Sequence, residues 1–457
     1  MWDFFEKSYQ YCTNIFAKWR NIGYYVSVTQ TTNTLEDIKT LITKEQRGES
    51  FYKSEFHTIL DDVKMALDRQ DSDSALNILI QWAIALRTSD VHLEIHEHDS
   101  VPRFRIDWDL APLGVLSLKE HENLVERLKY RSNLKLNIHN VPQDGKFRLG
   151  KTDKEAHIDI RVSVMPTRYG ESVVCRILDA TNNVLTIDAL GIIGSQKTAI
   201  LHSLEKKQWM ILVTGPTGSG KTTTLYTLID MLKNSEDKII TLEDPIEYQI
   251  PDVLQSEINE RDWYTFASGV RSVLRHDPDI IMIGEIRDLD TANTAIQAAL
   301  TGHLVLSTLH TKSAIETVDR LVNMGVSNYD IAASVDIIIA QRLVRRVCHH
   351  CGVSDENAPK LPGDAELLKK YWSEISFMQH GKWCEECGYT GYSGRIGIYE
   401  IFAVTDIIRD AIRSGHTDTE MFDIARKNGF LTLADDARAK VLLGMTTMEE
   451  CQKNGLL

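Results

Sequence analysis

The sequence predicts an α/β protein in which a phosphate-loop domain with a parallel sheet follows a smaller α+β domain and precedes a tetracysteine insert and a helical C-terminus. Three observations lead to this prediction. A glycine-rich loop at residues 215–222 joins an apolar strand to a helix. Four apolar strands alternate with helical stretches between residues 195 and 345, which implies a parallel sheet covered on both faces. Two Cys-x-x-Cys pairs lie beyond residue 345.

Length and composition limit the class of protein. A chain of 457 residues is long enough for several domains, and its 43% apolar and 25% charged residues are typical of a globular protein in water. No stretch approaches the length of an apolar membrane span, and the first residues do not resemble a secretion signal. The net charge of −14 argues against a nucleic-acid partner. The seven cysteines, an odd number, favour a reducing cytoplasm and metal binding over disulfides.

The loop carries the strongest motif. Residues 211–222 read ILVTGPTGSGKT, and the last eight fit the phosphate-loop pattern G-x-x-x-x-G-K-[ST]. Backbone N–H groups in such a loop converge on phosphates, and the following helix presents its positive end. We expect Lys221 to reach the β and γ phosphates and the Thr222 hydroxyl to bind Mg²⁺. The predicted nucleotide-binding residues of the loop are Gly215, Pro216, Thr217, Gly218, Ser219, Gly220, Lys221, Thr222 and Thr223.

Three of the predicted strands end in polar residues that can act on a bound phosphate. They are Glu243, Asp244 and Glu247 after residues 239–242, Glu285 after residues 280–283, and His303 and His310 around residues 304–308. Acidic groups beside a phosphate hold Mg²⁺ through water or align an attacking water molecule. A single carboxylate of this kind is more often a helix cap or an ion-pair partner. Three such strand ends beside a phosphate loop predict hydrolysis.

The region before the loop supplies positive charge. Residues 76–180 alternate polar and apolar side chains over several strands, with a helix at residues 120–131, and their polar faces are rich in arginine. The arginines are Arg103, Arg105, Arg148, Arg161 and Arg176. Hydrolysis profits from a cation beyond Lys221, because an arginine finger is worth about 10³–10⁵ in kcat. Spacing alone does not select one of these arginines.

The cysteine pairs predict a structural zinc site. The pairs are Cys348-x-x-Cys351 and Cys384-x-x-Cys387, with 32 residues between them. Four thiolates in two such turns match tetrahedral zinc with no open position. A single Cys-x-x-Cys motif would also suit redox chemistry, and His349 or His350 is an alternative metal ligand. Two complete Cys-x-x-Cys motifs favour a Cys₄ site. We expect the intervening residues to form a helical excursion.

The motifs together resemble the secretion-superfamily hexameric ATPases of type II secretion and type IV pilus assembly, from about Ser89 to the C-terminus. Besides the loop and the cysteines, the segments that carry the resemblance are Ser89–Glu94, Arg103–Asp107, Pro142–Gly145, Arg161–Ser163, Gly170–Glu171, the aspartate box Glu243–Glu247, the Walker B end Gly284–Asp288, the histidine box Thr301–His310, and Gly391–Gly397.

The resemblance implies roles for individual residues. Arg161 and Arg176 match the family's proposed arginine fingers, and Arg275 and Arg395 match further phosphate-site positions. Glu285 matches the catalytic glutamate, and Glu243 matches the acid that helps to place water and Mg²⁺.

The resemblance also implies a domain order. It consists of a helical region at 1–75, a PAS-like α+β domain at 76–185, a RecA-like ATPase domain at 195–345, a zinc-binding subdomain at 346–400 and a helical region at 401–457.

The implied assembly is a homo-hexamer at the cytoplasmic face of the inner membrane, which uses ATP to move a polytopic platform protein and so to assemble a pilus or pseudopilus. The N-terminal region, which does not show the family's usual leader domain, is expected to dock to a cytoplasmic-face assembly protein. Lys146 and Trp108 depart from the family pattern, which has arginine and glycine there.

The tetracysteine insert is typical of assembly motors, whereas retraction motors generally lack it. The short N-terminal region favours a pilus system over type II secretion without separating the two. A retraction motor, a DNA-uptake or DNA-translocation ATPase and a non-hydrolysing scaffold are the alternatives.

Overall fold

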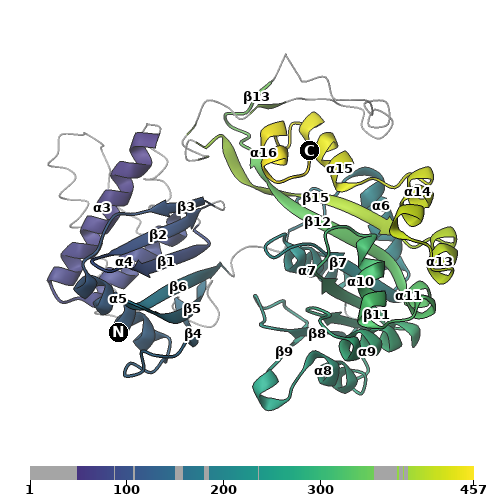
Figure 1. Ribbon diagram of the computed structural model, residues 1–457, viewed down its shortest axis with the longest axis horizontal. Coiled ribbons are helices and arrows are strands. Elements are labelled where there is room, and N and C mark those ends of the chain that lie inside the picture. The colour runs from purple at the N-terminus through teal and green to yellow at the C-terminus, as the bar shows by residue number, and fades with distance from the viewer. Residues whose placement is uncertain are drawn as a thin grey trace. The chain divides into compact units, whose positions relative to one another are not determined.

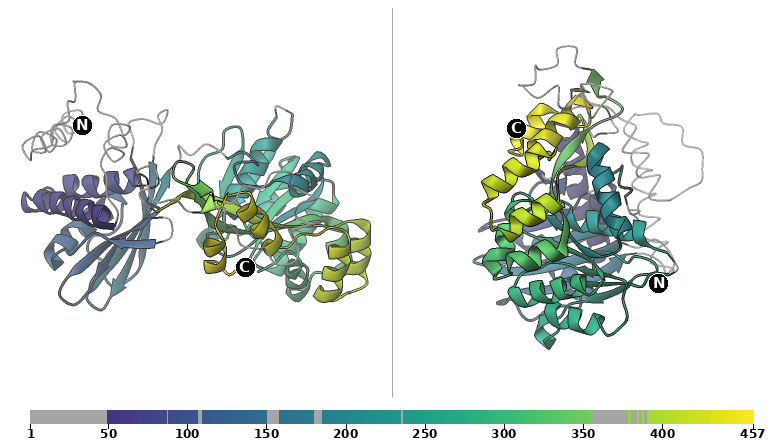
Figure 2. Two further views of the ribbon diagram at one scale, coloured as in Figure 1. Left: turned by 90° about the horizontal axis from the view of Figure 1, so that it is seen from above. Right: turned by 90° about the vertical axis from the view of Figure 1, so that its right-hand side faces the viewer.

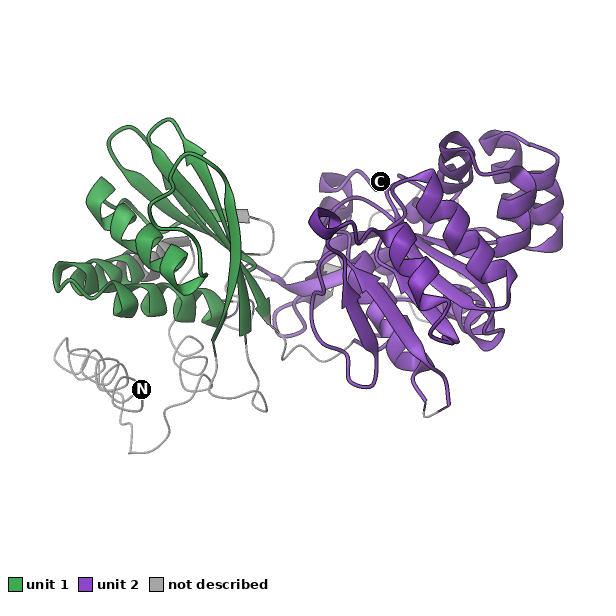
Figure 3. Ribbon diagram, turned by 90° about the horizontal axis from the view of Figure 1, so that it is seen from below, with its two compact units in different colours: residues 1–181 green, residues 182–457 purple. Residues whose placement is uncertain are grey.

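The computed structural model describes residues 49–86, 88–106, 109–149, 158–179, 185–234, 236–354, 378–379, 384, 387 and 390–457. The chain divides into two compact units, Met1–Thr181 and Asn182–Leu457, shown in green and purple in Figure 3. Among the described helices, none is long and apolar enough to cross a membrane. The first 48 residues, predicted to be helical, lie outside the described part of the chain.

The first unit is an antiparallel sheet in the order β3-β2-β1-β6-β5-β4 that shares a core with three helices (Figure 1). The strands are β1 Asp90–Ile95, β2 Ser100–Ile106, β3 Asp109–Pro112, β4 Gln143–Leu149, β5 Ile158–Thr167 and β6 Gly170–Asp179. The helices are α3 Glu49–Asp68, α4 Ser72–Ala85 and α5 Leu118–Arg131.

The alternation of apolar and polar residues explains this arrangement. Val91, Leu93 and Phe104 are fully buried and join the core beneath the helices, because successive strand residues point to opposite faces. Ile59 of α3 and Leu76 of α4 belong to the same core. Helix α3, which precedes the predicted boundary at residue 75, and helix α4, which spans it, therefore contribute to the same core as the sheet.

The second unit contains a seven-stranded sheet in the order β15-β12-β7-β11-β10-β8-β9. Every neighbouring pair is parallel except β12 and β15, which are antiparallel. The strands are β7 Trp209–Thr214, β8 Ile239–Glu243, β9 Leu254–Glu257, β10 Ile280–Ile283, β11 Leu304–Leu309, β12 Val335–Val347 and β15 Tyr392–Ala403. A separate short ribbon pairs β13 Val353–Ser354 with β14 Met378–Gln379.

Helices cover both faces of this sheet (Figure 2). The core on one face includes α6 Gly194–Glu205 and α7 Lys221–Leu232. The core on the other face includes α8 Phe266–Val273, α9 Leu289–Leu300, α10 Glu316–Met324, α11 Asn328–Ser334, α13 Asp406–Arg413 and α14 Asp418–Lys427. The remaining elements are the 3₁₀ turn η1 Glu260–Asp262, α15 Leu433–Leu442 and α16 Met448–Lys453.

The four apolar strands predicted between residues 195 and 345 are confirmed as β7, β8, β10 and β11, and the sheet is parallel as expected. The sheet also extends beyond the predicted segment. β12 crosses residue 345, and β15 returns beside it from the far side of the cysteine pairs. Polar residues interrupt β12, and polar and glycine residues interrupt β15, which explains why the sequence pattern did not reveal either strand.

Candidate functional site

The phosphate loop joins the end of β7 to the start of α7. Gly215, Gly218 and Gly220 have φ angles of 151°, 79° and 87°, in a region that side chains rarely adopt. A Cβ atom on Gly215 would lie 2.5 Å from the Gln341 carbonyl oxygen and 2.6 Å from Ser219 Oγ. The glycines of the motif are therefore required by both backbone conformation and space.

Lys221 lies against its own loop. Its Nζ donates to the carbonyl oxygens of Gly215 at 3.0 Å and Pro216 at 3.1 Å. Burial lowers the pKa of Lys221, while the negative charge of Glu285 opposes that effect. The loop lysine and the Walker B glutamate are thus within electrostatic reach of each other. Thr222 and Thr223 follow in the first turn of α7 and are half-buried.

Glu285 and His310 meet at the carboxyl ends of two neighbouring strands. Glu285 follows β10, His310 follows β11, and Nε2 of the histidine lies 3.1 Å from Oε2 of the glutamate. Arg287 binds the other oxygen of Glu285 through its Nε and lies 3.4 Å from the Asp244 carboxylate. The structure therefore brings Glu285, His310 and Asp244 into one charged cluster. Arg287, to which the sequence assigned no role, connects it.

Glu243 has a different environment. It is 2% exposed, and its carboxylate accepts hydrogen bonds from Tyr226 Oη, Thr241 Oγ1 and Gln255 Nε2, the last at 3.0 Å. Burial and the adjacent carboxylate raise the pKa of Tyr226, so its hydroxyl remains a donor. In this structure Glu243 ties β8 to α7 and β9. Its role in placing water and Mg²⁺ stays a prediction. Glu247 donates its backbone N–H to Tyr226 Oη at 3.4 Å.

His303 and Arg275 lie near the amino-terminal ends of the parallel strands, whereas the phosphate loop lies at the carboxyl ends. β11 is parallel to β7, with Leu304 opposite Trp209, so His303 stands where β7 begins, whereas the phosphate loop follows its end. Six residues of strand separate the two edges by about 20 Å. Arg275 precedes β10 at the same distant edge and donates to the Arg271 carbonyl at 2.8 Å. The structure does not bring these two predicted residues to the loop of this chain.

β12 brings residues to the loop that the sequence did not single out. Ala340 pairs with Thr214 at the end of β7, so the following residues run past the loop. Gln341 is fully buried against it. Arg342 donates to the Lys312 carbonyl at 2.8 Å. Arg395 lies on β15 opposite Arg345, farther along the same ribbon.

A cavity of about 460 Å³ lies beside the loop. Its lining residues are Gly215, Pro216, His310, Thr311, Lys312, Glu316, Asp319, Arg320, Asn323, Arg342 and Asp418. Asp418 has its pKa raised to about 6, first by burial and then by the carboxylate of Asp319. The cavity thus combines groups of both charges next to the start of the phosphate loop.

The sheet of the first unit carries a row of four cationic side chains and one carboxylate. Cross-strand partners place Arg105, Asp90, Arg176, Arg161 and Lys146 in line over β2, β1, β6, β5 and β4. Residues directly opposite one another share a sheet face, and this face is the one away from the helices. Asp90 holds Arg176 Nε at 2.9 Å and Arg105 Nε at 3.7 Å. The two predicted arginine fingers are therefore direct neighbours within this unit.

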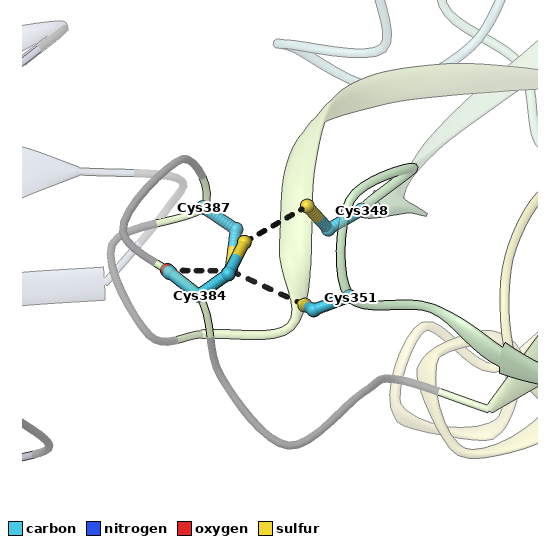
Figure 4. A group of neighbouring side chains, drawn as sticks. All are labelled: Cys348, Cys351, Cys384 and Cys387. Atoms are coloured by element: carbon cyan, nitrogen blue, oxygen red, sulfur yellow. Dashed lines mark hydrogen bonds between the residues drawn. The ribbon is translucent and has the colours of Figure 1, made fainter. Parts of the chain in front are cut away.

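The four cysteines of the predicted zinc site converge (Figure 4). Sulfur–sulfur distances are 3.6 Å for Cys348–Cys384, 3.7 Å for Cys351–Cys387 and 3.6 Å for Cys384–Cys387. A tetrahedral ion with sulfur ligands at about 2.3 Å separates its sulfurs by about 3.8 Å. The donor set and spacing therefore fit Zn²⁺. The predicted helical excursion between the pairs falls largely outside the described residues.

Fold and site define a phosphate-loop nucleotide-binding protein with a tetracysteine cluster. Residues 66–453 match the family described as type II/IV secretion system protein, and the chain belongs to that family. This confirms the family of secretion ATPases predicted from the motifs.

The chain is 39% identical to the type II secretion system protein HxcR of Pseudomonas aeruginosa, over 86% of this chain and 80% of that protein. It is 42% identical to the type IV pilus assembly ATPase PilB of Acinetobacter baylyi, over 83% of this chain and 65% of that protein. The chain thus spans less than two thirds of that PilB.

Among solved structures, the pilus retraction motor PilT with bound ADP is 27% identical with a TM-score of 0.56, over 82% of this chain and 95% of that one. The ATPase DotB of Legionella pneumophila shares the fold at 21% identity, with a TM-score of 0.60 and coverage of 83% and 94%.

Proposed function

We propose that this chain binds ATP with Mg²⁺ and hydrolyses it to drive the assembly of a type IV pilus or a type II secretion pseudopilus. The observation that supports hydrolysis most directly is the position of Glu285 and His310 at the strand ends beside the phosphate loop. The backbone N–H groups of residues 217–220 bind the phosphates, Lys221 neutralises them, and the Thr222 hydroxyl is a ligand of Mg²⁺. Glu285 aligns the attacking water.

The other acidic residues have supporting roles in this proposal. Asp244 lies in the same charged cluster as Glu285 through Arg287 and is suited to a hydrated Mg²⁺ ion. Glu247 belongs to the same segment. Glu243 acts through its hydrogen bonds, which hold the end of β8 against Tyr226 of α7.

Arg161 and Arg176 are proposed to stabilise the negative charge that develops on the transferred phosphoryl group. Their positions as cross-strand neighbours support this, because two guanidinium groups side by side form a strong anion site. Asp90 fixes the orientation of Arg176 through an ion pair at 2.9 Å. Arg395, on the ribbon that passes the loop, is a further candidate. His303 and Arg275 are not assigned contacts to phosphates bound by the same chain.

The tetracysteine cluster is proposed to hold one structural Zn²⁺. All four ligand positions are taken by thiolates, so the ion would link the segment after β12 to the segment before β15. Burial of Cys348 and Cys387 supports a closed site.

The mechanical function is proposed from the family and its named members. Both relatives described above act in secretion or pilus assembly by their names, and the cysteine cluster favours assembly over retraction. We propose a homo-hexamer that acts at the cytoplasmic face of the inner membrane on a polytopic platform protein. The N-terminal region is the proposed contact for an assembly protein. DNA uptake is the second candidate, but the charge of −14 argues against it.

ATP turnover by the purified chain with Mg²⁺ tests the enzymatic part. Lys221→Ala should reduce turnover to background, whereas Lys197→Ala, which removes a surface ion pair with Asp188 in the same unit, should leave it unchanged. Normal turnover by Lys221→Ala would refute the site. Stimulation by duplex DNA would favour the uptake alternative.

Two further measurements test the supporting roles. Arg161→Ala should lower turnover about 10³-fold or more with a smaller change in ATP affinity. Arg148→Ala, which removes a cation paired with Asp159 on a neighbouring strand, is the control. Elemental analysis should find about one zinc per chain, and Cys348→Ser should lose it. A folded zinc-free protein would exclude the metal site.

A further inference from the structure

Gln341 is a buried side chain that contacts the C-terminal end of the phosphate loop and the first turn of α7. It is fully buried on β12, one residue beyond the point where β12 and β7 stop pairing. Its Nε2 donates to the Ser219 carbonyl at 2.5 Å, and its Oε1 accepts from Thr224 Oγ1 at 2.8 Å. A carbonyl oxygen can only accept, so the Ser219 contact fixes which way the Gln341 amide faces. One side chain thus bridges the loop and the first turn of α7.

The hydrogen bond to Ser219 has a consequence for the next residue. In a trans peptide the C=O and the following N–H point in opposite directions. Because the Ser219 carbonyl is held towards β12, the N–H of Gly220 faces away from β12. The N–H groups of a phosphate loop bind their ligand only when they converge on one concavity. The orientation of this peptide therefore affects phosphate binding directly.

The two glycines of the motif lie close to residue 341 through different atoms. A Cβ atom on Gly220 would lie 3.1 Å from Nε2 of the Gln341 side chain, and one on Gly215 would lie 2.5 Å from the backbone carbonyl oxygen of Gln341. The Gln341 side chain therefore limits the space beside Gly220, whereas the backbone of β12 limits the space beside Gly215.

We propose that Gln341 is a positioning residue for nucleotide binding: it fixes the Ser219–Gly220 peptide so that the Gly220 N–H faces the phosphates. The inference rests on the proposed nucleotide-binding function and adds a residue from outside the loop motif to it. Thr224 completes the arrangement, since its hydroxyl holds the oxygen side of the same amide.

Calorimetric titration of the full chain with ADP and Mg²⁺ tests this inference. Gln341→Met keeps the size of the side chain and removes both hydrogen bonds, so ADP should bind about 10- to 100-fold more weakly. Gln341→Glu keeps the acceptor for Thr224 but turns an oxygen towards the Ser219 carbonyl, so its affinity should be lower still. Thr224→Val should give a smaller loss, and the loss in Thr224→Val/Gln341→Met should be less than additive.

Gln196 offers a matched control. It is also buried, and its Nε2 donates to the carbonyl of Tyr399, the β15 residue opposite Gln341, at 2.9 Å. Among the described residues, this hydrogen bond joins it to β15 and not to residues 215–224. Gln196→Met should lower the denaturation midpoint without changing ADP affinity. Hydrogen exchange of residues 215–224 in the nucleotide-free chain should rise in Gln341→Met and not in Gln196→Met.

Wild-type affinity for ADP in Gln341→Met would overturn the inference, as would an equal loss of affinity in Gln196→Met. If the wild-type chain itself does not bind ADP, the proposed function fails and the inference fails with it. The two failures are therefore distinguishable.

Discussion

Glu243 is the last residue of β8 and Glu285 follows the neighbouring parallel strand β10, yet their carboxylates lie in opposite surroundings. Glu243 is buried, and the side-chain donors to its carboxylate are two hydroxyls and an amide, all neutral. Glu285 is partly exposed and contacts a guanidinium and an imidazole. The comparison shows that a strand-end position does not define a chemical role. Burial and the charge of the partners do, because only a carboxylate with accessible oxygens can orient water.

The largest expected effect is on turnover at Glu285. Glu285→Gln should reduce ATP turnover by about 10²–10⁴-fold, because the side chain no longer accepts a proton from water. ATP binding, measured by titration, should persist. Glu260→Gln is the control, since Glu260 also lies near Arg287, at 3.9 Å, but is well exposed. Turnover unchanged in Glu285→Gln would assign the catalytic role to another carboxylate.

Glu243→Ala should act on stability. It leaves the hydroxyl groups of Tyr226 and Thr241 without the carboxylate that accepts from them, and each unsatisfied buried group costs about 1–3 kcal/mol. The urea midpoint should fall, and nucleotide addition should restore part of it. A variant with unchanged midpoint and lost turnover would instead support the family-derived catalytic role of Glu243.

Substitution of Gln255, which donates to Glu243, should affect stability, whereas substitution of Arg287, which pairs with Glu285, should affect turnover. Gln255→Leu removes a neutral donor from a buried acceptor and should lower unfolding stability by about 1 kcal/mol. Arg287→Gln removes exposed ion pairs, which contribute about 0–1 kcal/mol, so stability should hardly change while turnover falls. Urea midpoints and turnover of both variants check this contrast. A larger loss of stability in Arg287→Gln than in Gln255→Leu would contradict it.

The smallest expected effect is on the pH dependence of stability at Asp418, a carboxyl group whose surroundings differ from those of Glu243 and Glu285. Its pKa in the folded chain is raised to about 6 by burial and by Asp319, with Glu316 adding to the effect. A raised carboxyl pKa makes the folded state more stable at low pH, and this contribution is lost as pH rises through about 6. Asp418→Asn should therefore raise the melting temperature at pH 7.5 and have little effect at pH 4.5. Equal shifts at both pH values would rule out the titration.

The sequence predicted most of the sheet and the loop because both depend on local patterns. Apolar runs at β7, β8, β10 and β11 and the glycines at 215 and 220 are each readable without long-range information. Gln341 is separated from Ser219 by more than a hundred residues, so no local pattern marks it. His303 and His310 look equivalent around one strand in sequence. Only the parallel register shows that His310 lies at the strand ends next to the phosphate loop and that His303 lies at the other ends of the strands.

β12 carries Gln341 beside the loop, Arg345 bound to Glu450 of α16 at 2.7 Å, and Cys348 of the tetracysteine cluster just beyond its end. At about 3.3 Å per residue, Gln341 and Cys348 lie about 23 Å apart along one extended strand. The tetracysteine cluster and the side chain that holds the Ser219–Gly220 peptide thus belong to one continuous strand, which pairs with β15 over most of this length.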